Sequence, residues 1–209
     1  MSKSKDVAVD QVDVKRLVEE TDTGGREPGP LVARLLLLVA IAWSTFPLRI
    51  ASPLPFTLRV GIFNDTESRA IHLAFAVFLG FMAYPASTRS PSNRVPVTDW
   101  VMALVGAFCA GYLFLFYREL ATRPGSQTQM DVYVFIVGIV LLLEATRRVL
   151  GLPMVIVATL FLVYTFAGPH MPDMLAHRGA SLERAASHFW LTTEGVFGVA
   201  LGVSSGFIF

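Results

Sequence analysis

The sequence predicts an all-α integral membrane protein with five transmembrane helices, the start of a sixth and a polar N-terminal tail. Hydrophobic residues make up 54% of the 209-residue chain and charged residues only 16%, whereas soluble domains contain roughly 45–50% and about 25%. The charges are also unevenly distributed, because residues 1–30 hold 12 of the 33 Asp, Glu, Lys and Arg side chains. The rest of the chain therefore consists largely of apolar runs, as in a membrane protein.

Residues 1–30 are expected to form a disordered cytoplasmic tail. They contain seven acidic and five basic side chains, and too little apolar surface to offset the entropy of ordering. A signal peptide would need a basic segment followed directly by an apolar core and a small-residue cleavage site, and this segment does not have that order. Gly24-Gly25 and Pro28-Gly29-Pro30 close the tail.

Five apolar runs approach the length of about 20 residues that a helix needs to cross a hydrocarbon core of roughly 30 Å. They are Leu31–Leu48, Ala70–Ala86, Trp100–Tyr117, Val132–Leu143 and Val149–Pro169. The alternative, buried helices of a large soluble protein, would need far more polar surface to cover them. Membrane insertion is the better interpretation.

Local signals mark where several of these helices begin. Thr128, with Asp131 three positions later, matches a capping box before the fourth run, and Thr98-Asp99 precedes the third. Pro153 suits the first turn of a helix better than its centre. These positions support helix starts at the third, fourth and fifth runs.

Two further segments follow the fifth run. Ser181 is expected to cap a short helix that either lies at the membrane interface or packs against other helices. The apolar face of that helix would consist of Leu182, Ala185, Ala186, Phe189 and Trp190. From about Glu194 the chain is apolar up to Phe209, which predicts the start of a sixth helix. A natural terminus there would leave helical carbonyls unpaired in hydrocarbon, so the sequence is expected to be cut.

The basic residues favour a cytoplasmic N-terminus. With that orientation ten of the 17 Lys and Arg residues lie on the cytoplasmic side, including Arg147 and Arg148, as the positive-inside rule prefers. The net charge of +1 offers no basic surface to nucleic acid. The expected surroundings are the lipid bilayer, with no nucleic-acid partner.

Glu144 stands out because a carboxylate beside an apolar run is costly unless it is paired or hydrated. Arg147 and Arg148 follow at i+3 and i+4 on the same helical face, where they can form ion pairs with it. The sequence favours a structural ion pair of Glu144 with Arg147 or Arg148 over an ion-binding or proton-carrying role.

The sequence predicts no metal site and no cofactor. Cys109 is the only cysteine, which excludes an intrachain disulfide and a cysteine-based zinc site. The four histidines do not form the i, i+3 or i+4 pairs of helix-borne metal sites.

Residues 202–206 match the pattern G-x-S-x-G, which occurs at the nucleophile of many hydrolases. That motif requires a strand before the serine and a helix after it, and here it lies within an apolar helix candidate. Small residues for close helix packing are the better interpretation. The alternative is an intramembrane serine hydrolase using Ser204 or Ser205, with His177 or His188 as base. Overall we do not expect an enzyme.

Several segments resemble one transporter family. In chain order they are RAIHLAFAVFLGFMAYPA, RVPVTDW, RPGSQTQMD, LEATRRVLG and AHRGASLERAASHFWLTTEGVFGVALGVSSGFIF. From about residue 60 to residue 209 the chain resembles the fused permease of tripartite ATP-independent periplasmic (TRAP) transporters of the TAXI type. Residues 31–190 resemble the small membrane subunit, and residues 191–209 resemble the beginning of the large one.

This resemblance implies a multi-pass permease of the bacterial inner membrane. Such permeases take up organic acids delivered by a periplasmic TAXI-type solute-binding protein, driven by an ion gradient, usually of sodium. The substrate and sodium sites belong to later hairpins of the large subunit, so no ligand residue is carried over to this chain, and the remainder of the large membrane subunit is an expected partner. The residues that match the large-subunit start include Glu194, Gly195, Gly198, Gly202, Ser204 and Ser205.

If the resemblance holds, this 209-residue chain acts mainly as a scaffold and as a docking platform for the binding protein. The other possibility, besides the hydrolase, is a membrane scaffold without transport activity.

Overall fold

The protein is all-helical in a computed structural model. The model describes residues 25–53, 55, 57, 61–87, 90–91, 93–123, 125–172 and 174–206, and these contain no strand. Most of the predicted tail, residues 1–24, lies outside the described residues, as do residues 207–209.

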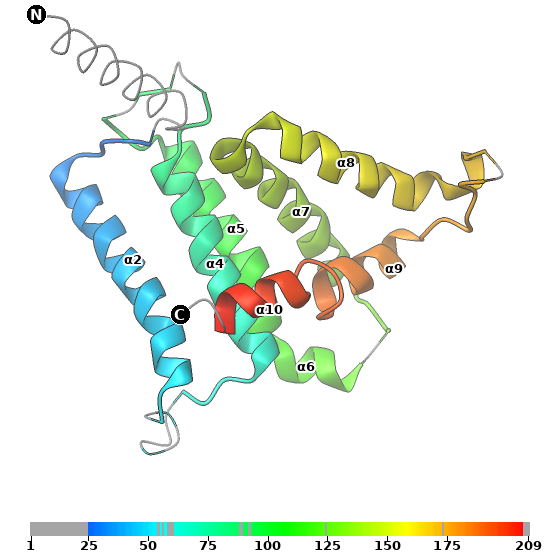
Figure 1. The fold of residues 1–209 in the computed structure, drawn as a ribbon, viewed down its shortest axis with the longest axis horizontal. Helices are drawn as coiled ribbons and strands as arrows, with labels where there is room; N and C mark the ends of the chain where they lie inside the picture. Colours follow the sequence, from blue (N-terminus) through cyan, green and yellow to red (C-terminus); the bar gives the residue numbers. More distant parts are fainter. Residues whose placement is uncertain are drawn as a thin grey trace, which may run out of the picture.

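Four long helices run alternately up and down (Figure 1). They are α2 (Pro30–Ala51), α4 (Asp65–Ala83), α5 (Val97–Leu115) and α7 (Gln129–Leu150). The short helix α6 (Tyr117–Thr122) follows α5, and α8 (Leu152–Ala167) follows α7. The start of α2, the end of α4, the start of α5 and the end of α7 therefore lie at one end of the molecule, which we call the tail end.

Helices α4, α5 and α7 form the core. Close approach of α4 and α5 requires a small residue at Gly106, where an added Cβ would lie 2.7 Å from Val77 Cγ1. Phe81 and Met82 of α4 are fully buried, and Leu113 of α5 is nearly so. This packing places α4 at the centre of the molecule, with α2 on its other flank.

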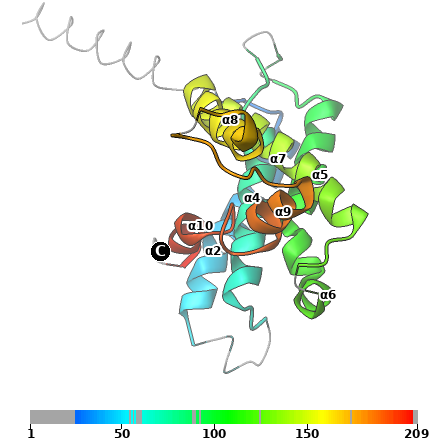
Figure 2. The ribbon, with the colours of Figure 1, turned by 90° about the vertical axis from the view of Figure 1, so that its right-hand side faces the viewer.

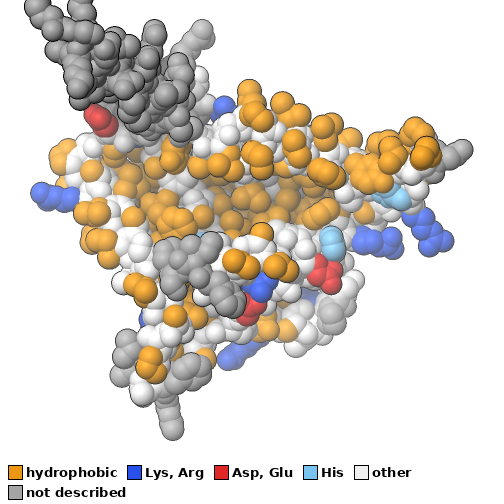
Figure 3. All heavy atoms as spheres, in the orientation of Figure 1, with side chains coloured by type: hydrophobic (Ala, Val, Ile, Leu, Met, Phe, Trp, Pro, Cys, Tyr) orange, Lys and Arg blue, Asp and Glu red, His pale blue; other side chains and the backbone are white. Residues whose placement is uncertain are grey.

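Helices α2 and α8 leave most of their apolar side chains exposed. Three helical segments are long and apolar enough to cross a membrane: Pro30–Ala51, Val97–Leu115 and Leu152–His170. In the first and third of these only 6% of the most apolar window is buried within the protein. Figure 3 shows hydrophobic side chains over both helices and the hollow between them. The chain therefore has the helices of a membrane protein, while five spans remain a prediction.

The helix boundaries follow the predicted runs, with one notable break. Gly151 has φ +84°, a conformation that side chains with Cβ disfavour, and it separates α7 from α8. The helix of the fifth run, predicted from Val149, therefore begins at Leu152, because Val149 and Leu150 belong to α7. It is followed by a 3-10 turn, η1 (Gly168–His170). As predicted, the Thr128–Asp131 capping box is present and Pro153 lies in the first turn of α8.

The C-terminal segment turns back across the helices. Helix α9 (Leu182–Ala186) continues into a π-helical turn, η2 (Ser187–Leu191), and α10 (Val199–Gly206) lies across α4 and reaches α2 (Figures 1 and 2). Ser181 caps α9 as expected. The sixth helix begins at Val199, five residues later than predicted, because residues 194–198 form turns.

Trp190 anchors this segment in the core. Its indole Nε1 donates a hydrogen bond to the Cys109 carbonyl at 3.0 Å, and its ring occupies the space that a side chain at Gly138 would need. Trp190 is only 1% exposed. Of the two alternatives for the helix after Ser181, the structure therefore supports packing against other helices.

Candidate functional site

A five-residue charge cluster lies at the tail end of the molecule. It consists of Arg26, Asp99, Glu144, Arg147 and Arg148. Asp99 comes from the first turn of α5, and the last two turns of α7 supply Glu144 and the two adjacent arginines. Arg26 precedes α2. Three separate parts of the chain thus bring their charges together.

Glu144 is paired with both arginines that follow it. Its Oε2 lies 2.7 Å from Arg147 Nε, and its Oε1 accepts from Arg148 Nε at 2.9 Å. The hydrogen bond from Arg147 lowers the pKa of the Glu144 carboxyl, against the opposing effect of burial. Glu144 follows the apolar run Val132–Leu143, so these pairs supply its counter-charge where the run ends.

Asp99 is the buried centre of the cluster. Its side chain is only 2% exposed, and its carboxylate accepts from Arg148 Nη1 at 3.0 Å and from Arg26 Nη2. Arg148 also lies over the Phe81 ring, with its Cζ 4.8 Å from the ring centroid. A buried charge must be paired to be tolerated, so Asp99 holds Arg148 of α7 and Arg26 against α5.

The arginines of the cluster also bind the end of α4 and the loop that follows it. Arg147 Nη2 donates to the Ala86 carbonyl at 2.7 Å, and the backbone N–H of Arg26 donates to the Ala83 carbonyl at 2.8 Å. The sequence predicted a solvated tail through Pro30, whereas the structure buries Arg26, which is 8% exposed. The cluster thereby joins α4, α5, α7 and the segment before α2.

A second polar cluster lies at the opposite end of the core. Asp131 is fully buried in the first turn of α7. It accepts from Arg123 Nη1 at 2.6 Å and from the Tyr112 hydroxyl at 2.7 Å. Burial raises the pKa of Asp131, but hydrogen bonds from Arg123, Thr128 and Tyr112 outweigh it and lower the pKa to about 2. Asp131 precedes the apolar run and stays ionised at neutral pH.

The residues of the possible hydrolase are not assembled. Ser204 donates to the Leu201 carbonyl at 3.0 Å and Ser205 to the Gly202 carbonyl at 3.2 Å, so both hydroxyls bond within their own helix. His177 bonds to the Tyr164 carbonyl at 3.0 Å. Among the described residues no histidine is hydrogen-bonded to either serine.

The predicted large-subunit start is a sequence of turns followed by α10. Glu194 Oε2 lies 3.0 Å from His188 Nδ1, and both side chains are exposed. Gly195 and Gly198 lie in the turns, where an added Cβ would collide with backbone atoms. Gly202 lies against a guanidinium from α4, a contact that residue spacing could not predict.

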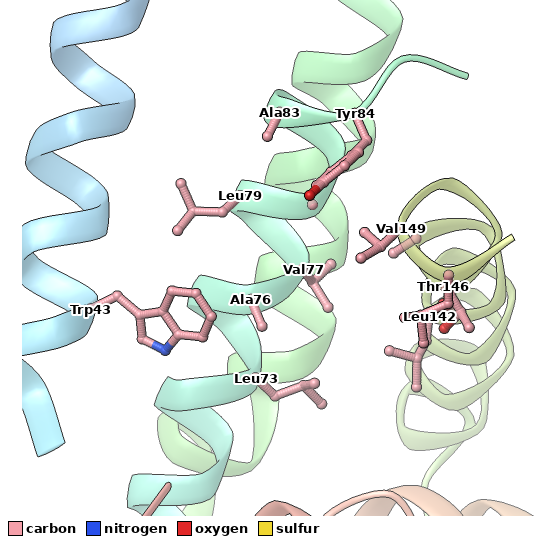
Figure 4. A pocket seen from close by; sticks show the side chains of 13 residues that line it. Trp43, Leu73, Ala76, Val77, Leu79, Ala83, Tyr84, Leu142, Thr146 and Val149 are labelled. Atoms are coloured by element: carbon pink, nitrogen blue, oxygen red, sulfur yellow. Dashed lines mark hydrogen bonds between the residues drawn. The ribbon is translucent and has the colours of Figure 1, made fainter. Parts of the chain in front are cut away.

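Two grooves between the long helices are apolar. A groove of about 430 Å³ lies between α2, α4 and α7 and is lined by Trp43, Leu73, Leu142, Tyr84 and neighbouring side chains (Figure 4). A second groove of about 370 Å³ lies between α7 and α8. Neither is lined by a charged residue, so they suit acyl chains or apolar helices better than a carboxylate ligand.

Within the described residues, no group of three or more His, Cys, Asp or Glu side chains could hold a metal ion. Comparisons with protein-family models, with curated proteins and with solved structures found no match to this chain. The site is therefore interpreted from its own geometry and from the sequence.

Proposed function

We propose that this chain is a membrane permease component of a TAXI-type TRAP transporter, acting mainly as scaffold and docking platform. Transport would be coupled to an ion gradient, with sodium as the expected ion and organic acids as substrates. On this proposal the chain resides in the bacterial inner membrane with a cytoplasmic N-terminus. Its partners would be a periplasmic solute-binding protein and the remainder of the large membrane subunit.

The observation that carries this proposal is the distribution of polarity. Apolar side chains are exposed along α2 and α8. In the part of the chain that the structure describes, the buried charged residues Arg26, Asp99, Asp131 and Arg148 belong to two clusters at opposite ends of the core. Charges near the ends of the spans and apolar surface between them suit a helix bundle in lipid. Together with the ordered resemblance over residues 60–209, this favours a permease.

The same distribution supports the scaffold role. An organic acid needs cationic or N–H donors that converge in a polar cavity. Neither apolar groove is lined by a charged residue, and the Trp43 indole N–H in the first groove already donates to His72 Nδ1 at 3.2 Å. Transport sites usually lie near the midplane between broken helices. In the described residues each buried guanidinium binds at least one carboxylate or carbonyl of another helix or segment, and these contacts stabilise helix packing.

The test is reconstitution of this chain in liposomes with a TAXI-type binding protein encoded beside it. We expect the binding protein to be retained by liposomes that carry the chain, while uptake of organic acids stays at the level of empty liposomes. Failure to retain the binding protein would contradict the docking role. Robust sodium-driven accumulation by this chain alone would contradict the division between scaffold and transport parts.

A further inference from the structure

Arg69, in the second turn of α4, reaches the segment that leads into α10. Its Nη1 donates to two successive backbone carbonyls, those of Phe197 at 2.8 Å and Gly198 at 3.0 Å. Its Nη2 is paired with Asp65 one turn earlier on α4. The Arg69 side chain is 16% exposed although it carries a full charge. One guanidinium thus joins α4 to two residues that lie 128 and 129 positions later in the chain.

Gly202 of α10 completes this contact. A Cβ added at Gly202 would lie 2.6 Å from both Cζ and Nη2 of Arg69, which is well inside van der Waals contact. The guanidinium therefore lies against the α10 backbone at a position where an added Cβ would displace it. Gly206, one turn later on the same helix, has no atom within 4 Å of an added Cβ.

The neighbouring residues are fixed as well. Phe197, whose carbonyl Arg69 holds, is fully buried and packs edge-on against Trp190, with ring centroids 5.6 Å apart. The N–H of Val196 donates to the Phe189 carbonyl at 2.9 Å. The turns before α10 are thus anchored on α5 and α7 through Trp190, and on α4 through Arg69.

We propose that Arg69 is a positioning residue that fixes the direction of α10 by clamping the carbonyls of Phe197 and Gly198 and the backbone at Gly202. Trp190 holds the preceding turn, but α10 follows it across several non-helical residues. Its second point of attachment is the guanidinium. The functional meaning rests on the proposed function, because α10 then belongs to the start of the transport part and Arg69 sets its place on the scaffold.

An arginine suits this task better than a lysine. Its planar guanidinium can donate to two carbonyls and a carboxylate at once in a fixed geometry, whereas an ammonium is a compact point charge on a flexible stem. The flat group also fits against a glycine backbone. We therefore expect Arg69→Lys to recover only part of the effect that Arg69→Gln removes.

The first test is a double-mutant cycle on the purified full chain. Gly202→Ala should lower the melting temperature by about 2–4 °C, which corresponds to a loss of roughly 1 kcal/mol in a chain of this size. In an Arg69→Ala background the same methyl group has room, so the loss should disappear. Gly206→Ala is the matched control and should not lower the melting temperature, because its added Cβ meets no atom within 4 Å. An equal loss in both backgrounds would overturn the proposal.

The second test measures position rather than stability. Spin labels on Val203→Cys of α10 and Leu104→Cys of α5, both exposed in the structure, are placed in a Cys109→Ala background. Arg69→Gln should broaden their distance distribution, Arg69→Lys should broaden it less, and Gly206→Ala should leave it sharp. A distribution unchanged by Arg69→Gln would overturn the proposal. Neither measurement depends on transport or on the binding protein. An unexpected result in the liposome experiment would therefore contradict the proposed function and leave the role of Arg69 untouched.

Discussion

At the scale of single residues, the buried charges differ in what their removal should cost. Asp99 is almost fully buried between two arginines, and its removal would take the ion-pair partner from Arg26 and leave Arg148 with Glu144 alone. Glu144 is more exposed and shares its arginines with other acceptors. Breaking a buried pair leaves an uncompensated charge, whereas exposed pairs contribute little. Asp99 should therefore matter more than Glu144.

The corresponding prediction concerns stability. Asp99→Ala should lower the free energy of unfolding by about 3–5 kcal/mol, while Glu144→Gln should lower it by about 1 kcal/mol or less. Denaturant unfolding of both variants in the same detergent would measure the difference. An equal loss of unfolding free energy in the two variants would contradict the greater contribution that we assign to Asp99.

Glu144 also yields a functional prediction. Because Arg147 and Arg148 occupy its carboxylate oxygens, we expect that it does not bind the coupling ion. In a complete permease, Glu144→Gln should leave the sodium dependence of uptake unchanged. A clear change in the sodium Hill coefficient would contradict the structural role.

A third residue prediction follows from Asp131, whose pKa is lowered to about 2 from 3.8 in the folded protein. A carboxyl with a depressed folded pKa stabilises the fold above its unfolded pKa, and this contribution is lost as pH falls towards the folded pKa. Stability should therefore decline as pH falls from 3.8 to about 2, and Asp131→Asn should be less stable at neutral pH but show a flatter decline. Thermal unfolding across that pH interval tests it. The same slope in both proteins would contradict it.

At the scale of the elements, close approach depends on small residues that face large ones. Gly138 of α7 receives the Trp190 ring, so Gly138→Ala should displace that ring and cost about 1–3 kcal/mol through overpacking. Gly111→Ala is a matched control on α5, because its added Cβ would lie 3.9 Å from Ala74 Cβ, an ordinary contact. Melting temperatures of the two variants give the comparison. Equal melting temperatures would mean that Trp190 does not need the glycine.

Contacts within a helix could be predicted from the sequence, whereas contacts between helices could not. Signals within one helical turn predict the structure correctly, because the Thr128–Asp131 capping box and the proline in the first turn of α8 are both present. The ion pairs of Glu144 likewise join residues three and four positions apart. Asp99, by contrast, looked like a helix-start residue and is paired with Arg148, 49 positions away. Such pairs depend on how helices pack, which local spacing does not determine.

The C-terminal segment illustrates the same limit. Apolar composition predicted a helix from about Glu194, but Gly195 and Gly198 lie in turns that bring backbone atoms close together. The contact of Arg69 with two backbone carbonyls leaves no trace in residue spacing, because any residue type supplies a carbonyl. The apolar grooves could not be predicted from the sequence either, because each is formed by side chains of different helices.

At the scale of the whole molecule, the alternation of α2, α4, α5 and α7 places the loops at two ends. The loop between α4 and α5 and the turn between α7 and α8 lie at the tail end with Arg26, while the loop before α7 lies at the other (Figure 1). Asn93 and Ser126 are exposed representatives of the two ends. A protein in a bilayer would present these two residues to different compartments.

The orientation itself can then be tested. With a cytoplasmic N-terminus, as the positive-inside rule favours for ten basic residues against seven, Asn93 faces the cytoplasm and Ser126 the periplasm. Single cysteines at these positions, in a Cys109→Ala background, are treated with a membrane-impermeant maleimide in intact spheroplasts. We expect Ser126→Cys to be labelled at once and Asn93→Cys only after the membrane is permeabilised. The reverse pattern would place the five-residue charge cluster on the periplasmic side, and the proposed cytoplasmic N-terminus would be wrong.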